Sequence, residues 1–286
     1  MLDQATIESL RLRACDLRID NLTMIAAAGN GHPGGTLSVM DILQTLYFAE
    51  MKHRPGEPQW AGRDRLVLSK GHAVPALYTV MAHAGYFSRD KLNTLRQLGS
   101  PLQGHPANFL LPGIEASTGS LGQGLSVALG MALASRLAGD AFRVYCIIGD
   151  GESQEGQIWE AALAAPKFKL DNLCVILDHN KGQIDGPVNQ VMSLDPIADK
   201  WRAFNWNVVT LDDGHDYKKI GTALDAARAS KGKPTFIVAE TVKGKGVSFM
   251  EGKIGWHGIA PSKEQLVDAV KELEASKAAL VSGKGN

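Results

Sequence analysis

The chain of 286 residues has few cysteines, no net charge and no long apolar run, and each absence excludes a class of protein. Its three cysteines are odd in number and lack CxxC spacing, which favours buried thiols in a reducing, cytoplasmic environment over a disulfide framework. No stretch reaches the ~20 apolar residues of a membrane span, and the N-terminus has no apolar signal core. A formal net charge of zero argues against nucleic acid or an anionic membrane surface as the main partner.

Two nucleotide-binding motifs are also absent. The sequence has no GxxxxGK[ST], and the glycines at Gly119, Gly122 and Gly124 do not have the dinucleotide spacing. What is present is a hydrophobic fraction of 44%, enough for a sizeable core. No strong linker interrupts the chain, so residues 1–286 are expected to form one domain with a flexible tail from about 275 to 286.

Apolar runs alternate with helical apolar spacing along the chain, which predicts an α/β fold. The expected elements are mostly parallel strands in one sheet, with helices covering both of its faces. Strands are expected at 65–68, 144–148, 173–177, 208–211 and 235–239. Helices are expected at 5–28, from Ser38 onward, and at 76–85, 88–98, 120–137, 155–168, 196–204, 217–229 and 263–281.

Two polar side chains each follow one of the buried strands. Asp150 comes after the apolar run 144–148, and Asn180 comes after the run 173–177, with a helical pattern between them. A strand, a helix and a strand form a parallel crossover, which brings both strand ends to one edge of the sheet. Carboxylate and carbonyl oxygens are ligands that Mg²⁺ prefers beside substrate phosphates. The pattern therefore predicts a diphosphate site with a small hard cation.

Five histidines stand next to a glycine: His32, His72, His105, His215 and His257. Histidine is the side chain best placed to move protons near neutral pH, and a neighbouring glycine lets the backbone approach a ligand. His215, in a DGHD string after a strand, is expected to be structural. Each of the others alone is typical of a loop histidine with a satisfied hydrogen bond, but together they indicate a site.

One stretch of the chain resembles the thiamine diphosphate motif of the transketolase superfamily. It contains GDG, then EG, then the pair EA, and an asparagine after the next strand. The matching residues here include Asp150, Gly151, Glu155, Glu160 and Asn180. The strings GHPGG, S-x-GH, GHP, TG-x-LGQG and a late HG also occur in this order in transketolases. They cover nearly the whole chain, with serine at position 120 where the family usually has proline.

The resemblance implies a role for each matching residue. The metal, Mg²⁺ or Ca²⁺, would be held by Asp150, the Asn180 amide oxygen and the main-chain carbonyl of Gly182. Thiamine diphosphate would be bound by His72, Gly119, Ser120, Leu121, Asp150, Gly151, Glu155, Asn180 and His257. The catalytic residues would be His32, His105 and His257, which would handle hydroxyl protons of the sugar, and Glu160 would lie at a subunit interface.

The resemblance also implies a missing half. In this superfamily a glutamate on a second, pyrimidine-binding domain activates the cofactor, and this sequence has no match to that domain. The expectation is an N-terminal subunit of a split transketolase, which transfers a two-carbon ketol unit from a ketose to an aldose, with or without phosphate groups. A separate C-terminal subunit would supply the pyrimidine-binding domain, and the assembly is expected to be a heterotetramer.

Three other interpretations stay open. The α subunit of a 2-oxo-acid dehydrogenase shares the metal motif, but the GHPGG and LGQG strings fit it poorly. Half of an enzyme similar to deoxyxylulose-phosphate synthase is suggested by the segment 241–249, TVKGKGVSF. A non-catalytic module that only holds thiamine diphosphate would not require all four of the histidines in these motifs.

Overall fold

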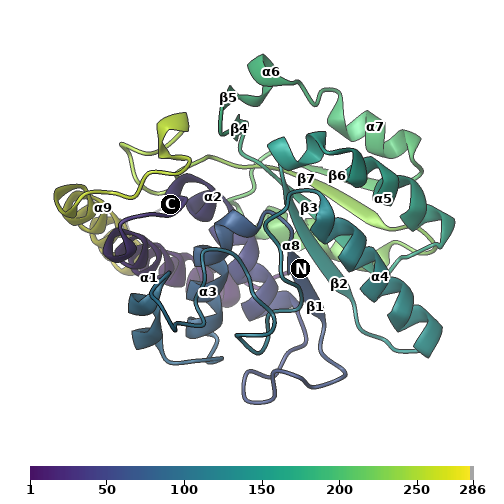
Figure 1. Ribbon diagram of the computed structural model, residues 1–286, viewed down its shortest axis with the longest axis horizontal. Coiled ribbons are helices and arrows are strands. Elements are labelled where there is room, and N and C mark those ends of the chain that lie inside the picture. The colour runs from purple at the N-terminus through teal and green to yellow at the C-terminus, as the bar shows by residue number, and fades with distance from the viewer. Residues whose placement is uncertain (284–286) are drawn as a thin grey trace.

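Five parallel strands form the centre of the molecule in a computed structural model that describes residues 1–283 (Figure 1). They are β1 (Arg65–Leu68), β2 (Val144–Gly149), β3 (Leu173–His179), β6 (Asn207–Leu211) and β7 (Thr235–Glu240), in the spatial order β1-β2-β3-β7-β6. Val144 pairs with Leu173 and Gly149 with Asp178, so β2 and β3 end side by side. The parallel sheet and the shared strand edge that the sequence predicted are confirmed.

Helices cover both faces of the sheet, as predicted. On one face lie α1 (Gln4–Ala28), α2 (Pro33–Thr45), α3 (Val74–His83) and α8 (Tyr217–Ala229), and on the other lie α4 (Gln123–Ala138), α5 (Gly156–Lys167) and α7 (Ile197–Ala203). Successive residues of β2 enter opposite cores, Tyr145 on the α1 side and Cys146 on the α4 side. Burial on both faces explains why the strands are continuous apolar runs rather than alternating patterns.

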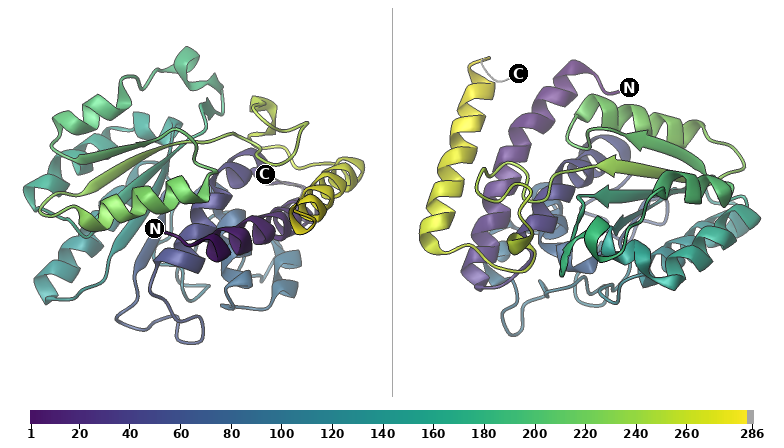
Figure 2. Two further views of the ribbon diagram at one scale, coloured as in Figure 1. Left: turned by 180° about the vertical axis from the view of Figure 1, so that it is seen from behind. Right: turned by 90° about the horizontal axis from the view of Figure 1, so that it is seen from above.

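The last helix, α9 (Lys263–Val281), lies beside α1 (Figure 2). Ser262 begins it with a capping box that includes Gln265, and Lys277 pairs with Asp16 of α1 at 2.6 Å. Residues 275–281, where the sequence suggested a flexible tail, therefore continue α9, and residues 284–286 lie outside the described residues. Within residues 1–283 no helix is both long and apolar enough to cross a bilayer.

Two helices differ from expectation by more than three residues at one end. The helix expected from Ser38 begins at Pro33, because proline suits the first helical turn, where its missing N–H is not needed. The helix expected over 88–98 is a short 3-10 helix, Arg89–Thr94, and Arg96 just beyond it has a φ of 60°, which is incompatible with continuing a right-handed helix. A π-helical turn (Leu46–Glu50) and the small elements β4 (Gly182–Gln183), β5 (Gly186–Pro187) and α6 (Val188–Val191) were not predicted.

Candidate active site

A cleft of about 340 Å³ opens at the carboxyl ends of the strands. Its walls come from the segments that follow β1, β2, β3 and β7, from the turn between α1 and α2, and from the loop before α4. Of the expected site residues, the lining includes His32, His72, His105, Gly119, Leu121, Gly151, Glu155, Asn180, Gly182 and His257. Ser120 is exposed, Asp150 is buried beneath the surface, and neither lines the cleft.

Three histidines from distant parts of the chain form a cluster in this cleft. The His32 ring centroid lies 5.0 Å from that of His72 and 5.5 Å from that of His257, and the His72 and His257 centroids are also 5.5 Å apart. Burial, reinforced by nearby positive charges, lowers the pKa of His32 to about 4 and that of His257 to about 3. The same causes hold the pKa of His72 well below its ordinary range. All three rings are therefore neutral at pH 7 and can each donate one hydrogen bond and accept another.

His105 reaches the same cleft from the loop before α4. A side chain on Gly119 would lie 2.8 Å from its imidazole ring, so the close contact between this ring and the loop requires glycine. Burial, and then the charge of Arg96, lowers the pKa of His105. Within the described residues, the Nδ1 atom of His32 is buried without a hydrogen-bond partner. Such an atom is costly to leave unpaired, which is an argument for a polar ligand in the cleft.

Two buried lysines, which the sequence analysis did not select, add positive charge to the cleft. Lys70 is 1% exposed and pairs with Asp178, while Lys243 is 2% exposed and places its Nζ atom 3.1 Å from Nδ1 of His257. Burial and the charge of Lys70 lower the pKa of Lys243 to about 8. Buried ammonium groups in one cleft match the chemistry of a diphosphate. A sequence signal existed, since each lysine stands beside a glycine just after a strand, in SKGH and TVKGKG.

The expected metal ligands lie together at the ends of β2 and β3. One Asp150 oxygen contacts Nδ1 of His179, and the other accepts a hydrogen bond from the Lys181 amide at 2.8 Å. Asn180 donates from its amide nitrogen to Asp178 at 3.2 Å, which turns its amide oxygen toward the Gly182 N–H at 3.1 Å. Burial raises the pKa of Asp150, although the hydrogen bond with His179 opposes this shift.

This donor set of one carboxylate, one amide oxygen and one main-chain carbonyl fits a small hard cation. It is not a site built from imidazole and thiolate ligands, and in residues 1–283 no three His, Cys, Asp or Glu side chains gather in a way that could hold a metal.

A buried glutamate, also absent from the sequence-based predictions, fixes the glycine-rich loop of the cleft. The Glu152 carboxylate accepts hydrogen bonds from the Gly122 amide at 3.0 Å and the Gly149 amide at 3.1 Å, and from the Ser69 hydroxyl. It thereby ties the loop before α4 to the ends of β1 and β2. Burial raises the pKa of Glu152, while these three hydrogen bonds oppose that shift.

Comparison with known proteins identifies the family of the chain. The family model described as "Transketolase, thiamine diphosphate binding domain" matches residues 3–277. A 6-deoxy-6-sulfo-D-fructose transketolase subunit from a Clostridium species is 47% identical over 93% of this chain and 96% of its own length. An apulose-4-phosphate transketolase subunit from Phocaeicola vulgatus is 42% identical over 93% of this chain and 94% of its own.

Longer transketolases match this chain over only part of their own length. The crystal structure of transketolase from Campylobacter jejuni superposes with a TM-score of 0.89 at 34% identity, covering 99% of this chain and 47% of that protein. Human transketolase is 40% identical over 95% of this chain and 43% of its own length. These matches confirm the family that the motifs indicated: the chain belongs to the transketolase family and is a transketolase subunit that carries the thiamine diphosphate-binding domain.

Proposed function

We propose that this subunit, together with a second subunit, transfers a two-carbon ketol unit from a ketose to an aldose. The observation that carries the proposal is the cluster of His32, His72 and His257 with Lys243, in the same cleft as the strand ends that bear Asp150 and Asn180. Neutral proton-transfer groups, buried ammonium groups and oxygen ligands then occupy one region. This combination is suited to a diphosphate cofactor and a polyhydroxylated substrate.

Thiamine diphosphate, when bound, would supply the carbanion chemistry of ketol transfer. Asp150, Asn180 and the Gly182 carbonyl would hold Mg²⁺ or Ca²⁺, with the Asn180 side chain oriented by Asp178 and Ser38. The buried ammonium group of Lys243 and the neutral ring of His72 would face the diphosphate. Gly119, Ser120, Leu121, Gly151 and Glu155 would form the remaining cofactor contacts that the motif implies.

The proton-transfer groups of the reaction would be His32, His105 and His257. A neutral imidazole can take a proton from a sugar hydroxyl and return it later, and the lowered pKa values keep these rings neutral near pH 7. The Nδ1 atom of His32, which has no hydrogen-bond partner in residues 1–283, is available for such a hydroxyl group.

The partner would be a separate C-terminal subunit with the pyrimidine-binding domain, and we propose a heterotetramer. Two curated relatives that this chain matches along almost their full length, and a third that it matches along 88% of its length, are named as transketolase subunits. Apolar side chains beside the cleft support an interface there, because Ile184 is 71% exposed and Met192 is 61% exposed. A cytoplasmic location is supported by the three free, buried cysteines.

The decisive experiment is an activity assay of the two subunits, separately and mixed, with thiamine diphosphate and Mg²⁺. The names of the relatives suggest donors to include: a 6-sulfonated ketose and a 4-phosphorylated ketose, next to xylulose 5-phosphate and an unphosphorylated ketose. Ketol transfer is expected only in the mixture. Turnover by this chain alone would contradict the split-enzyme proposal.

The same assay separates the alternatives. If the mixture binds thiamine diphosphate but transfers no ketol unit to any aldose, the chain is a cofactor-holding module. If pyruvate and glyceraldehyde 3-phosphate are consumed instead, the chain is half of an enzyme similar to deoxyxylulose-phosphate synthase. Failure of the mixture to bind thiamine diphosphate at all would contradict every version of the proposal.

A further inference from the structure

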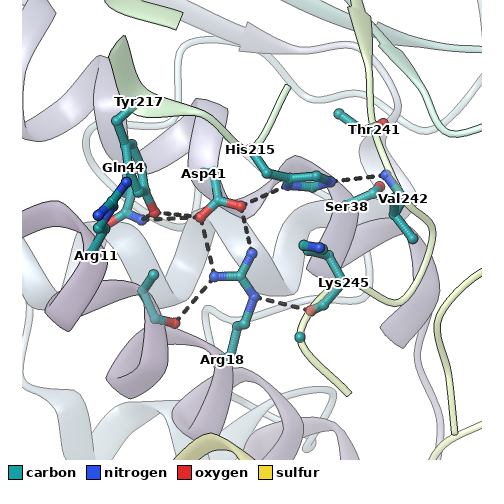
Figure 3. A network of polar contacts seen from close by, with 12 residues as sticks. Arg11, Arg18, Ser38, Asp41, Gln44, His215, Tyr217, Thr241, Val242 and Lys245 are labelled. Atoms are coloured by element: carbon teal, nitrogen blue, oxygen red, sulfur yellow. Dashed lines mark hydrogen bonds and ion pairs between the residues drawn. The ribbon is translucent and has the colours of Figure 1, made fainter. Parts of the chain in front are cut away.

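A buried polar network behind the cleft is centred on the carboxylate of Asp41 in α2 (Figure 3). The carboxylate accepts hydrogen bonds from both terminal nitrogens of Arg18 in α1, at 3.1 and 2.6 Å. It also contacts Nδ1 of His215 at 2.7 Å and the Tyr217 hydroxyl. The side chains of Arg18 and His215 are 7% and 9% exposed. Although burial opposes it, the charge of Arg18 holds the pKa of Asp41 far below its ordinary value.

The hydrogen-bond partners of His215 define its protonation. The Val242 amide, which can only donate, lies 2.9 Å from Nε2 of His215, so this nitrogen is an acceptor. The proton is therefore on Nδ1, where it is donated to Asp41. His215 is thus a neutral imidazole that connects a carboxylate on α2 to the main chain just after β7, on the right of Figure 3.

The network holds the main chain on both sides of Lys243. Val242 donates to His215, and the Lys245 carbonyl accepts from Nε of Arg18 at 3.0 Å. Between them, the Gly244 amide donates to the Gly34 carbonyl at 3.0 Å. Three hydrogen bonds from two helices and one loop therefore define where the turn 242–245 lies.

The side chain of Lys243 passes from this turn into the cleft between two glycines. A Cβ atom on Gly34 or on Gly182 would lie 3.0 Å from a methylene carbon of Lys243. At the far end, the ammonium group reaches His257 at 3.1 Å. A channel this narrow leaves the lysine few alternative rotamers, so a shift of its backbone would move the ammonium group rather than be absorbed by the side chain.

We propose that His215 is a positioning residue for the cofactor site, and that it acts through Lys243. It fixes the Val242 amide so that the ammonium group of Lys243 lies in the cleft where the diphosphate would bind. This inference rests on the proposed function, because it takes a diphosphate as the group that Lys243 faces. A purely structural His215 would instead support the fold without affecting the cofactor affinity of the folded protein.

The test is a double-mutant cycle measured by calorimetric titration of Mg²⁺ and thiamine diphosphate into the assembled subunits. His215→Phe keeps the ring volume but leaves the Val242 amide unpaired, and we expect it to weaken cofactor binding about tenfold. Lys243→Met should weaken binding by itself. In the Lys243→Met background, adding His215→Phe should cause almost no further loss, because the group through which His215 acts is gone.

Two further variants separate positioning from folding. His215→Gln can both donate to Asp41 and accept from Val242, so it should recover most of the affinity. His83→Phe is the matched control, since His83 also pairs with a partly buried carboxylate, Asp20 at 2.7 Å, but does not line the cleft. It should lower the melting temperature and leave the cofactor affinity unchanged.

Two outcomes would overturn the inference while leaving the proposed function intact. One is a folded His215→Phe protein that binds the cofactor as tightly as wild type. The other is a tenfold loss that persists in the Lys243→Met background. If His215→Phe does not fold, His215→Asn replaces it in the same cycle, because the shorter asparagine amide can still donate to Asp41 but does not also reach the Val242 amide. The same two outcomes then decide. Absence of cofactor binding by the wild-type assembly would instead refute the proposed function.

Discussion

At the scale of single residues, two buried aspartates can be compared: Asp150 belongs to the candidate site and Asp64 does not. Asp150 is 3% exposed, and its oxygens contact Nδ1 of His179 and the Lys181 amide next to Asn180. Asp64 is similarly buried, at 4%, but lies at the amino end of β1, where it accepts from the Lys52 and Arg143 amides at 2.8 Å each. The two residues therefore separate the effect of losing a buried carboxylate from the effect of losing a metal ligand.

Asp150→Ala is expected to abolish metal-dependent binding of thiamine diphosphate, because the diphosphate charge would lose its compensating cation. Asn180→Ala should weaken binding less, since it removes a neutral oxygen. Calorimetric titration of the assembled subunits with Mg²⁺ measures both effects. Asp64→Ala, the control, should lower the melting temperature and leave affinity unchanged. Unchanged affinity in both site variants would contradict the metal assignment.

At the scale of elements, α4 shows how one helix serves both the fold and the site. Gly124 lies in its first turn against the end of β1, and a Cβ atom there would be 2.8 Å from Cα of Ser69. Ser69 in turn donates to Glu152, which holds the glycine-rich loop. Gly130, further along the same helix, has open space around it. The same substitution in the same helix should therefore have opposite effects.

Gly124→Ala is expected to destabilise the protein by about 1–3 kcal/mol, because a backbone atom cannot move aside as a flexible side chain can. It should also weaken cofactor binding by displacing Ser69 and the loop at Gly119. Gly130→Ala should stabilise the protein by about 0.5–1 kcal/mol through helix propensity. Chemical denaturation gives both free energies of unfolding. Equal free energies of unfolding for the two variants would contradict the close packing of Gly124 against Ser69.

At the scale of the whole molecule, the histidine cluster predicts how stability depends on pH. Unfolded histidine has a pKa of about 6.5, whereas burial lowers the pKa of folded His32 to about 4 and of His257 to about 3. At a pH between the folded and the unfolded pKa values, the unfolded chain binds more protons than the folded one. Stability is therefore greatest above about pH 6.5, and it falls as the pH decreases through that value toward the folded pKa values.

The melting temperature without cofactor is expected to fall between pH 7.5 and pH 5, and His257→Gln should reduce that fall because glutamine does not titrate. Since the His257 ring is partly exposed, solvent moderates the size of the effect. His83→Gln, which alters a histidine outside the cluster, provides the comparison. Parallel curves of melting temperature against pH for wild type and His257→Gln would show that the cluster does not carry this dependence.

Local patterns in the sequence determined most of the fold and part of the site. The apolar runs 65–68 and 144–148 predicted β1 and most of β2, and the helix 217–229 was predicted with both of its ends. The adjacency of Asp150 and Asn180 followed as well, because neighbouring parallel strands joined by a crossover helix must end at one edge. These features depend on residues close in sequence, or on a single topological rule.

The resemblance had already named the four histidines of the cleft, but only the tertiary structure decided how they come together and which other side chains join them. His32, N-terminal to α2, meets His72 and His257 because α2 contacts both the 3-10 turn Gly71–Ala73 and the 3-10 turn Ile254–Trp256 just before His257. Lys243 lies in the cleft because Gly34 and Gly182 leave room for it. His215, a structural residue in the sequence analysis, reaches Asp41 across 174 positions of chain. No local periodicity encodes such contacts, since they arise from packing between elements whose faces are specified only as apolar or polar.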